Sequence, residues 1–253
     1  MKLLFLTFYY PPDLSAGSFR SHALIQALEP YRTGQLEIDL LTTMPNRYHE
    51  MVNEAKPLEC ETGLCIRRFT LPTHRSGMVD QSRAFSVFAK AVFNHVSTRQ
   101  YDAVFATSSR LMTAVLAAHI ARTKRIPLHL DIRDLFTDTI DNLFARSPLK
   151  LTTPLVQALE RWSYGAAERM TIVSEGFRAH VQRIAPSTPV SCFTNGIDDE
   201  FLKSDFTGEG GSTDPRPLIL YAGNIGEGQG LHHVIPEAAK RLALQARFRV
   251  IGG

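Results

Sequence analysis

Cysteine is scarce in this sequence, and no long hydrophobic run is present. The 253 residues hold three cysteines, Cys60, Cys65 and Cys192, which are too few and too widely spaced for a disulfide framework. Cys60 and Cys65 have no neighbouring pair of Cys or His to complete a zinc site, so we expect idle thiols in a reducing compartment and no metal. No segment approaches the roughly 18 consecutive apolar residues that cross a bilayer.

An excess of charge of either sign is also missing. Lys and Arg number 28 against 25 Asp and Glu, a net charge of +3, so we expect no basic surface of the kind that binds nucleic acid. Hydrophobic residues make up 44% and charged residues 21%, which excludes a largely disordered chain. The apolar residues 1–10 stop at two prolines, and no signal-peptide cleavage pattern follows. We therefore expect a soluble, cytoplasmic protein whose first residues form a buried strand.

Short apolar runs alternate with helical patterns along the first 203 residues. This alternation is typical of βαβ units, which build a parallel sheet covered by helices on both faces. We therefore predict an α/β fold with a Rossmann-like first domain over residues 1–203. After the first strand, the predicted strands are 38–41, 66–71, 103–106, 128–132, 170–173 and 190–193. The predicted helices include 82–96, 111–122, 151–168 and 177–184.

The composition changes after Phe201. Residues 204–217 are rich in Gly, Ser, Thr, Asp and Pro and hold no large apolar cluster, as in a linker. Beyond them, residues 218–221 and 248–251 favour strands on either side of a helix at 231–244. One βαβ unit cannot cover both faces of its own sheet. We therefore interpret residues 218–253 as the truncated start of a second Rossmann-like domain.

Small, hydroxylated and charged residues follow the predicted strands at their carboxyl ends. In an open parallel sheet these ends form one edge, where loops and helix N-termini bind ligands. The rule selects Gly17, Thr107, Ser108, Ser109, Asp131, Arg133, Asp134, Ser174, Glu175, Thr194, Asn195 and Gly196. We expect a cleft for a polar ligand along this edge.

Gly17 and Asp131 are the strongest candidates for direct contact with a ligand. Gly17 would let a ligand approach the backbone near the positive end of a helix, although a plain turn explains it equally well. Asp131 ends a buried strand, where its carboxylate could orient or deprotonate a hydroxyl. The alternative for Asp131, Arg133 and Asp134 is an ion pair with a helix cap. We take Asp131 as the functional group and Arg133 with Asp134 as the structural pair.

Three further features have competing interpretations. Ser174 suits a helix N-cap before Glu175. Asn195-Gly196 is a strong turn signal, which competes with ligand contact. The apolar stripe from Phe85 to Val96, flanked by basic residues, fits a helix packed in the core or one lying on a membrane surface. Core packing is the default for such a stripe.

Several motifs with a known chemistry are incomplete. The segment 223–230 has the glycine spacing of a phosphate loop but lacks its Lys and Ser/Thr, although its amides could still bind a phosphate at a helix start. No dinucleotide fingerprint follows the first strand, which disfavours a nicotinamide-dependent enzyme. No nucleophile elbow is present, so hydrolase chemistry is weakly supported.

Five short motifs in order carry a resemblance to a known family. They are Phe8-Tyr9-Tyr10-Pro11-Pro12 with Gly17, Asp131-Ile132-Arg133-Asp134-Leu135, Val173-Ser174-Glu175-Gly176-Phe177, Asn195-Gly196-Ile197-Asp198 and Tyr221-Ala222-Gly223-Asn224-Ile225-Gly226. Over its whole length the chain resembles bacterial GT-B glycosyltransferases of the family-four type, close to those of lipopolysaccharide and capsule assembly.

The resemblance implies two Rossmann-like domains facing across a cleft, the first for the acceptor and the second for a nucleotide-sugar. It implies sugar transfer to a hydroxyl acceptor, with retention of configuration and without a metal or cofactor. The acceptor would be a lipid-linked or polysaccharide precursor, with peripheral contact at the inner face of the membrane. By position, Gly17 matches the glycine beside the donor diphosphate and Asp131 the group that meets the acceptor hydroxyl. Ser108, Ser109, Arg133, Glu175 and Asn195 would line the acceptor side, and Asn195 leads into the hinge.

The match of the donor loop is incomplete. Gly223, Asn224, Gly226 and Gln229 occupy its positions, but the family often carries Arg and Lys where this chain has Asn224 and Gln229. Either other residues neutralise the diphosphate or donor binding is altered. The family's E-x7-E segment would lie beyond Gly253, so we expect this chain alone to be inactive in transfer. The alternative is a non-catalytic module that binds a sugar or a partner on the same fold.

Overall fold

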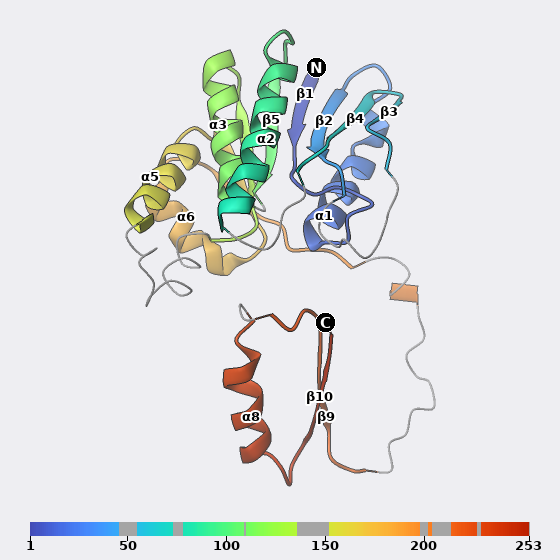
Figure 1. The fold of residues 1–253 in the computed structure, drawn as a ribbon, viewed down its shortest axis with the longest axis vertical. Coiled ribbons are helices and arrows are strands. Elements are labelled where there is room, and N and C mark those ends of the chain that lie inside the picture. Colours follow the sequence, from blue (N-terminus) through green and yellow to red (C-terminus); the bar gives the residue numbers. More distant parts are fainter. Residues whose placement is uncertain are drawn as a thin grey trace. The chain divides into compact units, whose positions relative to one another are not determined.

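The computed structural model divides the chain into two compact units, Met1–Gly196 and Ile197–Gly253. The first unit is an α/β domain and the second holds two strands and a helix (Figure 1). This division falls before the predicted linker at 204–217, of which only the last residues are described. The structure describes residues 1–45, 55–72, 78–108, 110–135, 152–197, 202–203, 214–226 and 229–252.

The first unit is built on one eight-stranded sheet. Its strand order is β3-β4-β2-β1-β5-β6-β7-β8, and every neighbouring pair is parallel except β3 with β4. The predicted α/β fold with a parallel sheet is therefore confirmed, and β3 is an antiparallel edge strand that the alternation of patterns did not predict. The strands are β1 (Lys2–Leu6), β2 (Glu37–Thr43), β3 (Leu58–Glu61), β4 (Leu64–Phe69), β5 (Ala103–Ser108), β6 (Leu128–Ile132), β7 (Arg169–Ile172) and β8 (Val190–Cys192).

Helices cover both faces of this sheet. Successive residues of a strand point to opposite faces, so Leu4 and Leu6 of β1 belong to one core cluster and Phe5 to another. The Phe5 cluster packs under α1, and the larger cluster packs under α2, α3 and α5 (Figure 1). The helices are α1 (Ala16–Ala27), α2 (Met78–Val96), α3 (Leu111–Lys124), α5 (Thr153–Tyr164) and α6 (Arg178–Ile184), with 3-10 turns at Glu29–Tyr31 and Glu175–Phe177.

The apolar stripe of α2 lies in the core. Phe85, Phe88, Val92 and Val96 are all buried, and Phe88 packs edge-to-face against Phe8. The core interpretation of this helix is confirmed. Most of the side chains that would enter lipid are packed against the sheet, although Phe93 of the same stripe is 37% exposed, so the stripe gives little support to a membrane-surface role.

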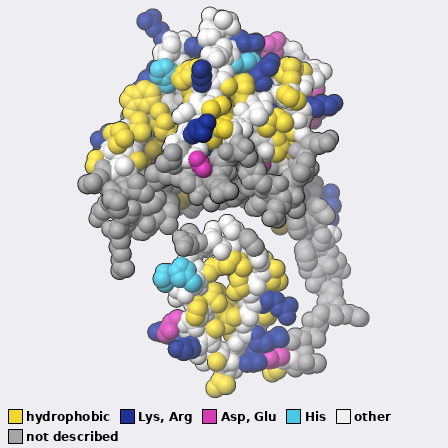
Figure 2. Space-filling model, in the orientation of Figure 1, with side chains coloured by type: hydrophobic (Ala, Val, Ile, Leu, Met, Phe, Trp, Pro, Cys, Tyr) yellow, Lys and Arg dark blue, Asp and Glu magenta, His cyan; other side chains and the backbone are white. Residues whose placement is uncertain are grey.

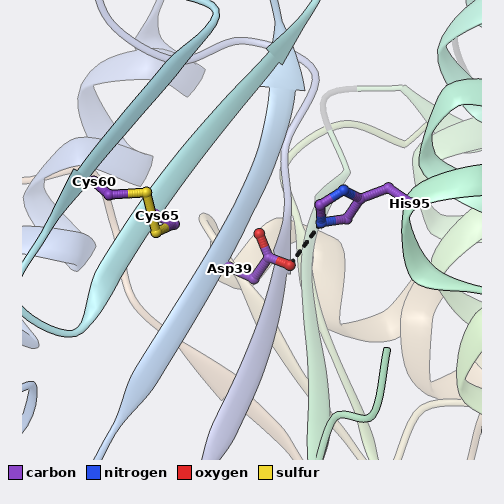
Figure 3. Close-up of a disulfide and its surroundings, with 4 residues drawn as sticks. All are labelled: Asp39, Cys60, Cys65 and His95. Carbon is purple, nitrogen blue, oxygen red and sulfur yellow. Dashed lines mark hydrogen bonds and ion pairs between the residues drawn. A yellow bond between two sulfur atoms is a disulfide. The ribbon is translucent and has the colours of Figure 1, made fainter. Parts of the chain in front are cut away.

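The hairpin of β3 and β4 brings two cysteines together. Cys60 and Cys65 occupy directly opposite positions of the antiparallel pair and form a disulfide (Figure 3). The expectation of idle thiols is therefore wrong for this pair, while Cys192 is free. The turn of the hairpin requires glycine at Gly63, whose φ is +67°. A Cβ at Gly63 would also lie only 2.9 Å from the backbone oxygen of Leu36.

The second unit is a βαβ unit, as the sequence predicts. Strands β9 (Leu218–Ala222) and β10 (Arg247–Ile251) pair in parallel, and α8 (Leu231–Arg241) lies between them in the chain. One helix can cover only one face of a sheet, and hydrophobic side chains remain exposed on this unit (Figure 2). They include Leu218, Ile219, Leu220, Val250 and Ile251. Across the described residues of both units, no helix has the length and apolarity needed to span a membrane.

Candidate functional site

The carboxyl edge of the first unit's sheet gathers the predicted residues. Gly17 lies in α1 just after the loop that follows β1, Asp131 lies in β6, and Asn195 follows β8. One side chain, Arg20 of α1, connects Asp131 with Asn195. Arg20 also lies one helical turn after Gly17. Asp131 and Asn195 are 64 residues apart, and both are within hydrogen-bond reach of the Arg20 guanidinium.

Arg20 holds Asp131 in a bidentate ion pair. Its Nε donates to Oδ2 and its Nη2 to Oδ1 of Asp131, each at 3.0 Å. The Asp131 side chain is 4% exposed and that of Arg20 is 18% exposed. Two parallel, charge-assisted hydrogen bonds fix both the distance and the orientation of the guanidinium. The pair is therefore a rigid element of the edge, with the arginine on its more exposed side.

The remaining nitrogen of Arg20 points to the last residues of the unit. Nη1 donates to the backbone oxygen of Thr194 at 3.3 Å and approaches Asn195 Oδ1 at 3.5 Å. Asn195 itself is exposed. Arg20 thus ties the start of the predicted hinge to the buried carboxylate of Asp131.

Neighbouring strands complete the surroundings of Asp131. Thr171 lies opposite it in β7 and donates its hydroxyl to Asp131 Oδ1 at 2.7 Å. Ser108, the last residue of β5, donates to the backbone oxygen of Asp131 at 3.3 Å. Ser108 is fully buried, so its side chain holds β6 in place. The prediction that Ser108 lines a cleft is therefore wrong. The next candidate, Ser109, lies outside the described residues.

Gly17 lies against the guanidinium of Arg133. It is the second residue of α1, where glycine is a poor helix former. A Cβ at this position would collide with Arg133 Nη1, so the close approach of the guanidinium requires a glycine. The alternative of an ion pair within the segment 131–134 does not describe Asp131, while the pair of Arg133 with Asp134 stays a prediction. Asp131 pairs with Arg20, and Arg133 reaches the start of α1.

Glu175 lies farther along the same edge, after β7. Ser174 accepts a hydrogen bond from the backbone N–H of Gly176, so its predicted N-cap role is confirmed, at a 3-10 turn. Glu175 is exposed and pairs with Arg178 in two hydrogen bonds of 2.6 and 2.7 Å. The hydrogen bonds from Arg178 lower the pKa of the Glu175 carboxyl, so Glu175 is a charged surface acceptor and a poor source of a proton near neutral pH.

The glycine loop of the second unit is partly closed by its own side chains. Gln229 Oε1 accepts from the backbone N–H of Gly226 at 3.1 Å, and the Tyr221 hydroxyl donates to the backbone oxygen of Asn224 at 2.7 Å. The N–H of Gly223 donates to Ile251 of β10. The Gln229 amide oxygen therefore occupies an N–H that would otherwise be open to a phosphate oxygen. Gly230 is the N-cap residue of α8 and has the left-handed conformation, with a φ of +61°.

A separate polar cluster lies toward the amino ends of the strands. Asp39 of β2 accepts from the Tyr101 hydroxyl at 2.5 Å and pairs with His95 Nε2 of α2 at 2.8 Å (Figure 3). Burial alone would raise the pKa of Asp39, but the hydrogen bonds from His95 and Tyr101 outweigh it and lower the pKa. The cluster thus keeps a buried carboxylate charged between the sheet and α2. It lies away from the carboxyl edge, and sequence patterns gave no sign of it.

Arg20 and Thr171 are the site residues that sequence patterns missed. Arg20 is one turn after Gly17 on the same helix, and this spacing is the one signal that could have drawn attention to it. In the ranges that the structure describes, no three His, Cys, Asp or Glu side chains gather so that they could hold a metal ion.

Solved structures of sugar-transferring enzymes share this fold. Sucrose-phosphate synthase from Thermosynechococcus elongatus matches all of this chain at a TM-score of 0.64 and 12% identity, and the chain spans 62% of that protein. HepE (Alr3699) from Anabaena, solved with UDP, matches at a TM-score of 0.53 and 14% identity over 100% of this chain and 70% of its own. UGT89C1 from Arabidopsis thaliana, also solved with UDP, matches at a TM-score of 0.53 and 12% identity. The match covers 99% of this chain and 66% of UGT89C1. The fold is that of the GT-B glycosyltransferases.

The sequence comparison names the family more closely. Residues 22–196 match the model of the glycosyl transferase 4-like domain. This match covers more than half of the chain, so the chain belongs to that family. A comparison with curated proteins gave no match.

Proposed function

We propose that the protein is a glycosyltransferase that moves a sugar from a nucleotide-sugar to a hydroxyl acceptor. The family match over residues 22–196 carries this proposal. Two of the similar structures were solved with UDP, which supports a nucleotide-sugar as the donor. We further propose that transfer retains the configuration of the sugar, needs no metal, and uses a polysaccharide or lipid-linked precursor as acceptor. These finer points follow from the resemblance of the motifs, and the α2 stripe gives little support to contact with lipid.

The arginines at the carboxyl edge suit the charge that develops during transfer. When the bond between the sugar and the diphosphate breaks, negative charge grows on the leaving diphosphate, and the acceptor oxygen bonds to the sugar carbon. Arg20 and Arg133 lie beside Gly17 at the N-terminus of α1, and the first turn of α1 holds no acidic residue. Fixed cations and a helix N-terminus stabilise such a charge without a metal.

The geometry favours an indirect role for Asp131. Its carboxylate is buried and already accepts three side-chain hydrogen bonds, from Arg20 and Thr171. A base that deprotonates an acceptor must reach the hydroxyl, and Arg20 stands on the more exposed side of Asp131. We therefore propose that Asp131 is a positioning residue, which fixes Arg20 at the edge and keeps its guanidinium oriented.

A donor screen with the full-length gene product tests the function. The protein is incubated with UDP-, GDP- and dTDP-sugars and a set of glycan and lipid-linked acceptors, and products are measured by mass. We expect one donor to give a product heavier by one sugar residue, together with free nucleoside diphosphate. Binding of a nucleotide-sugar without any product would favour the non-catalytic module, for which the occupied N–H of Gly226 is the structural argument. If the protein neither binds a nucleotide-sugar nor forms a product, the result contradicts both the glycosyltransferase and the non-catalytic module.

A further inference from the structure

A groove of about 570 Å³, lined by both polar and apolar side chains, opens between α1 and the β3–β4 hairpin. Its walls come from α1, from the loop at Tyr10–Pro12 and from both strands of the hairpin. None of Gly17, Arg20 and Asp131 lines it, so it is distinct from the carboxyl-edge site. Its volume falls within the roughly 300–1,000 Å³ of small-molecule sites.

Two buried arginines form its most unusual feature. Arg32 and Arg68 are 7% and 6% exposed. Arg32 Nη1 donates to Glu61 Oε1 at 2.5 Å, and Arg68 Nη1 donates to Glu59 Oε1 at 2.8 Å. Both glutamates are exposed at the rim. Arg68 also donates to the backbone oxygens of Lys56 and Pro11, so its guanidinium is held in the wall of the groove, while the exposed glutamates place carboxylate acceptors at the mouth.

Neutral polar groups and apolar side chains complete the walls. The Tyr10 hydroxyl lies 3.3 Å from His22 Nδ1, and burial raises the pKa of Tyr10 to about 12, so the hydroxyl stays neutral and can both donate and accept. Gln26 of α1 also lines the groove, and Ile25 and Ile66 are among its apolar side chains.

The mixture of charges favours a neutral ligand over an ion of either sign. Three carboxylates, of Glu29, Glu59 and Glu61, line the groove and oppose an anion, while the two guanidiniums oppose a cation. A sugar hydroxyl both donates and accepts hydrogen bonds, so it can bond to arginine N–H donors and carboxylate acceptors that lie side by side. The C–H face of a sugar ring can pack on apolar side chains.

We propose that this groove binds a neutral oligosaccharide, the glycan part of the acceptor or product. This use of the bound glycan rests on the proposed function. The groove includes Tyr10 and Pro12, and the loop that they begin leads directly to Gly17. A glycan held there would keep the growing chain close to the carboxyl edge between transfers.

Glycan binding is measured on the 253-residue chain without any donor. Maltotetraose, cellotetraose, tetra-N-acetylchitotetraose and mannotetraose are tested by saturation-transfer NMR and calorimetry, with sialyllactose as an anionic probe. The test variant is Gln26→Ala with Glu29→Gln, which changes one exposed residue of α1 and one of the 3-10 turn that follows it. The matched control is Gln182→Ala with Glu168→Gln, exposed residues of the same unit outside the groove. Far-ultraviolet circular dichroism checks that both variants fold.

We expect at least one neutral tetrasaccharide to bind, with a dissociation constant raised fivefold or more by the groove variant and unchanged by the control. Binding of none of the four, binding equal in both variants, or binding of sialyllactose alone would overturn the proposal. The outcome is independent of the donor screen. A protein that transfers sugar without binding glycans here refutes only the groove, and one that binds glycans without transfer refutes only the function.

Discussion

Replacing Arg20 with methionine is expected to lower the free energy of unfolding of the first unit by about 3–5 kcal/mol. The variant Arg20→Met leaves the Asp131 carboxylate buried, at 4% exposure, without its cation. Thr171 would still donate one hydrogen bond to Asp131, but one neutral donor cannot replace a bidentate guanidinium. The loss should be far larger than that from an exposed arginine.

Urea unfolding followed by tryptophan fluorescence measures this loss. Trp162 is the one tryptophan of the chain and lies in α5, so its signal reports on the first unit. The control Arg83→Ala removes an exposed arginine of α2 and should change stability by less than about 0.5 kcal/mol. Adding Asp131→Asn to Arg20→Met removes the buried charge and should recover a large part of the loss. A loss below about 1 kcal/mol in Arg20→Met would show that the ion pair is not formed.

Replacing Gly17 with alanine is expected to reduce sugar transfer by about 100-fold, as small displacements at a reacting centre do. The new methyl group would collide with Arg133 Nη1, and the guanidinium would have to leave the start of α1. Stability should change little, because alanine is favoured over glycine inside a helix by about 1 kcal/mol. Activity and stability should therefore separate in this variant.

The matched control is Gly176→Ala, whose added methyl group would meet only Ser174 Oγ at an ordinary 3.5 Å. Initial rates are measured with the donor and acceptor that the screen identifies, on the full-length gene product. The collision with Arg133 predicts that transfer survives in the control and falls in Gly17→Ala. Full activity in Gly17→Ala would show that neither the glycine nor the position of Arg133 matters to the reaction.

The elements of the fold could be predicted because their signals are local. Apolar runs at strand length and stripes at helical spacing located every strand of the parallel sheet in the described residues. The α2 stripe is an example, since Phe85, Phe88 and Val92 repeat at helical spacing and are buried together. The edge strand β3 has no such pattern, because its residues are mostly exposed.

The contacts of the site could not be predicted, because they join distant parts of the chain. Arg20 and Asp131 are 111 residues apart, and their pairing depends on the order and register of β1, β5 and β6. Asp131 and Arg133 are close in sequence, which suggested a local ion pair as one alternative, but Asp131 pairs with Arg20 of α1 and Arg133 lies beside Gly17. The disulfide could not be predicted for a similar reason, since it depends on the antiparallel register of β3 with β4.

The turnover number of Asp131→Asn in the full-length gene product tests the central claim most directly. The claim is that the carboxyl edge, with Arg20 oriented by Asp131, is where sugar is transferred. Asparagine keeps the shape of the side chain but removes the charge that orients Arg20. We predict that kcat falls about 100-fold while KM for the donor changes by less than about threefold, at a temperature where Trp162 fluorescence shows the variant folded. A folded Asp131→Asn variant with near wild-type kcat would contradict the claim.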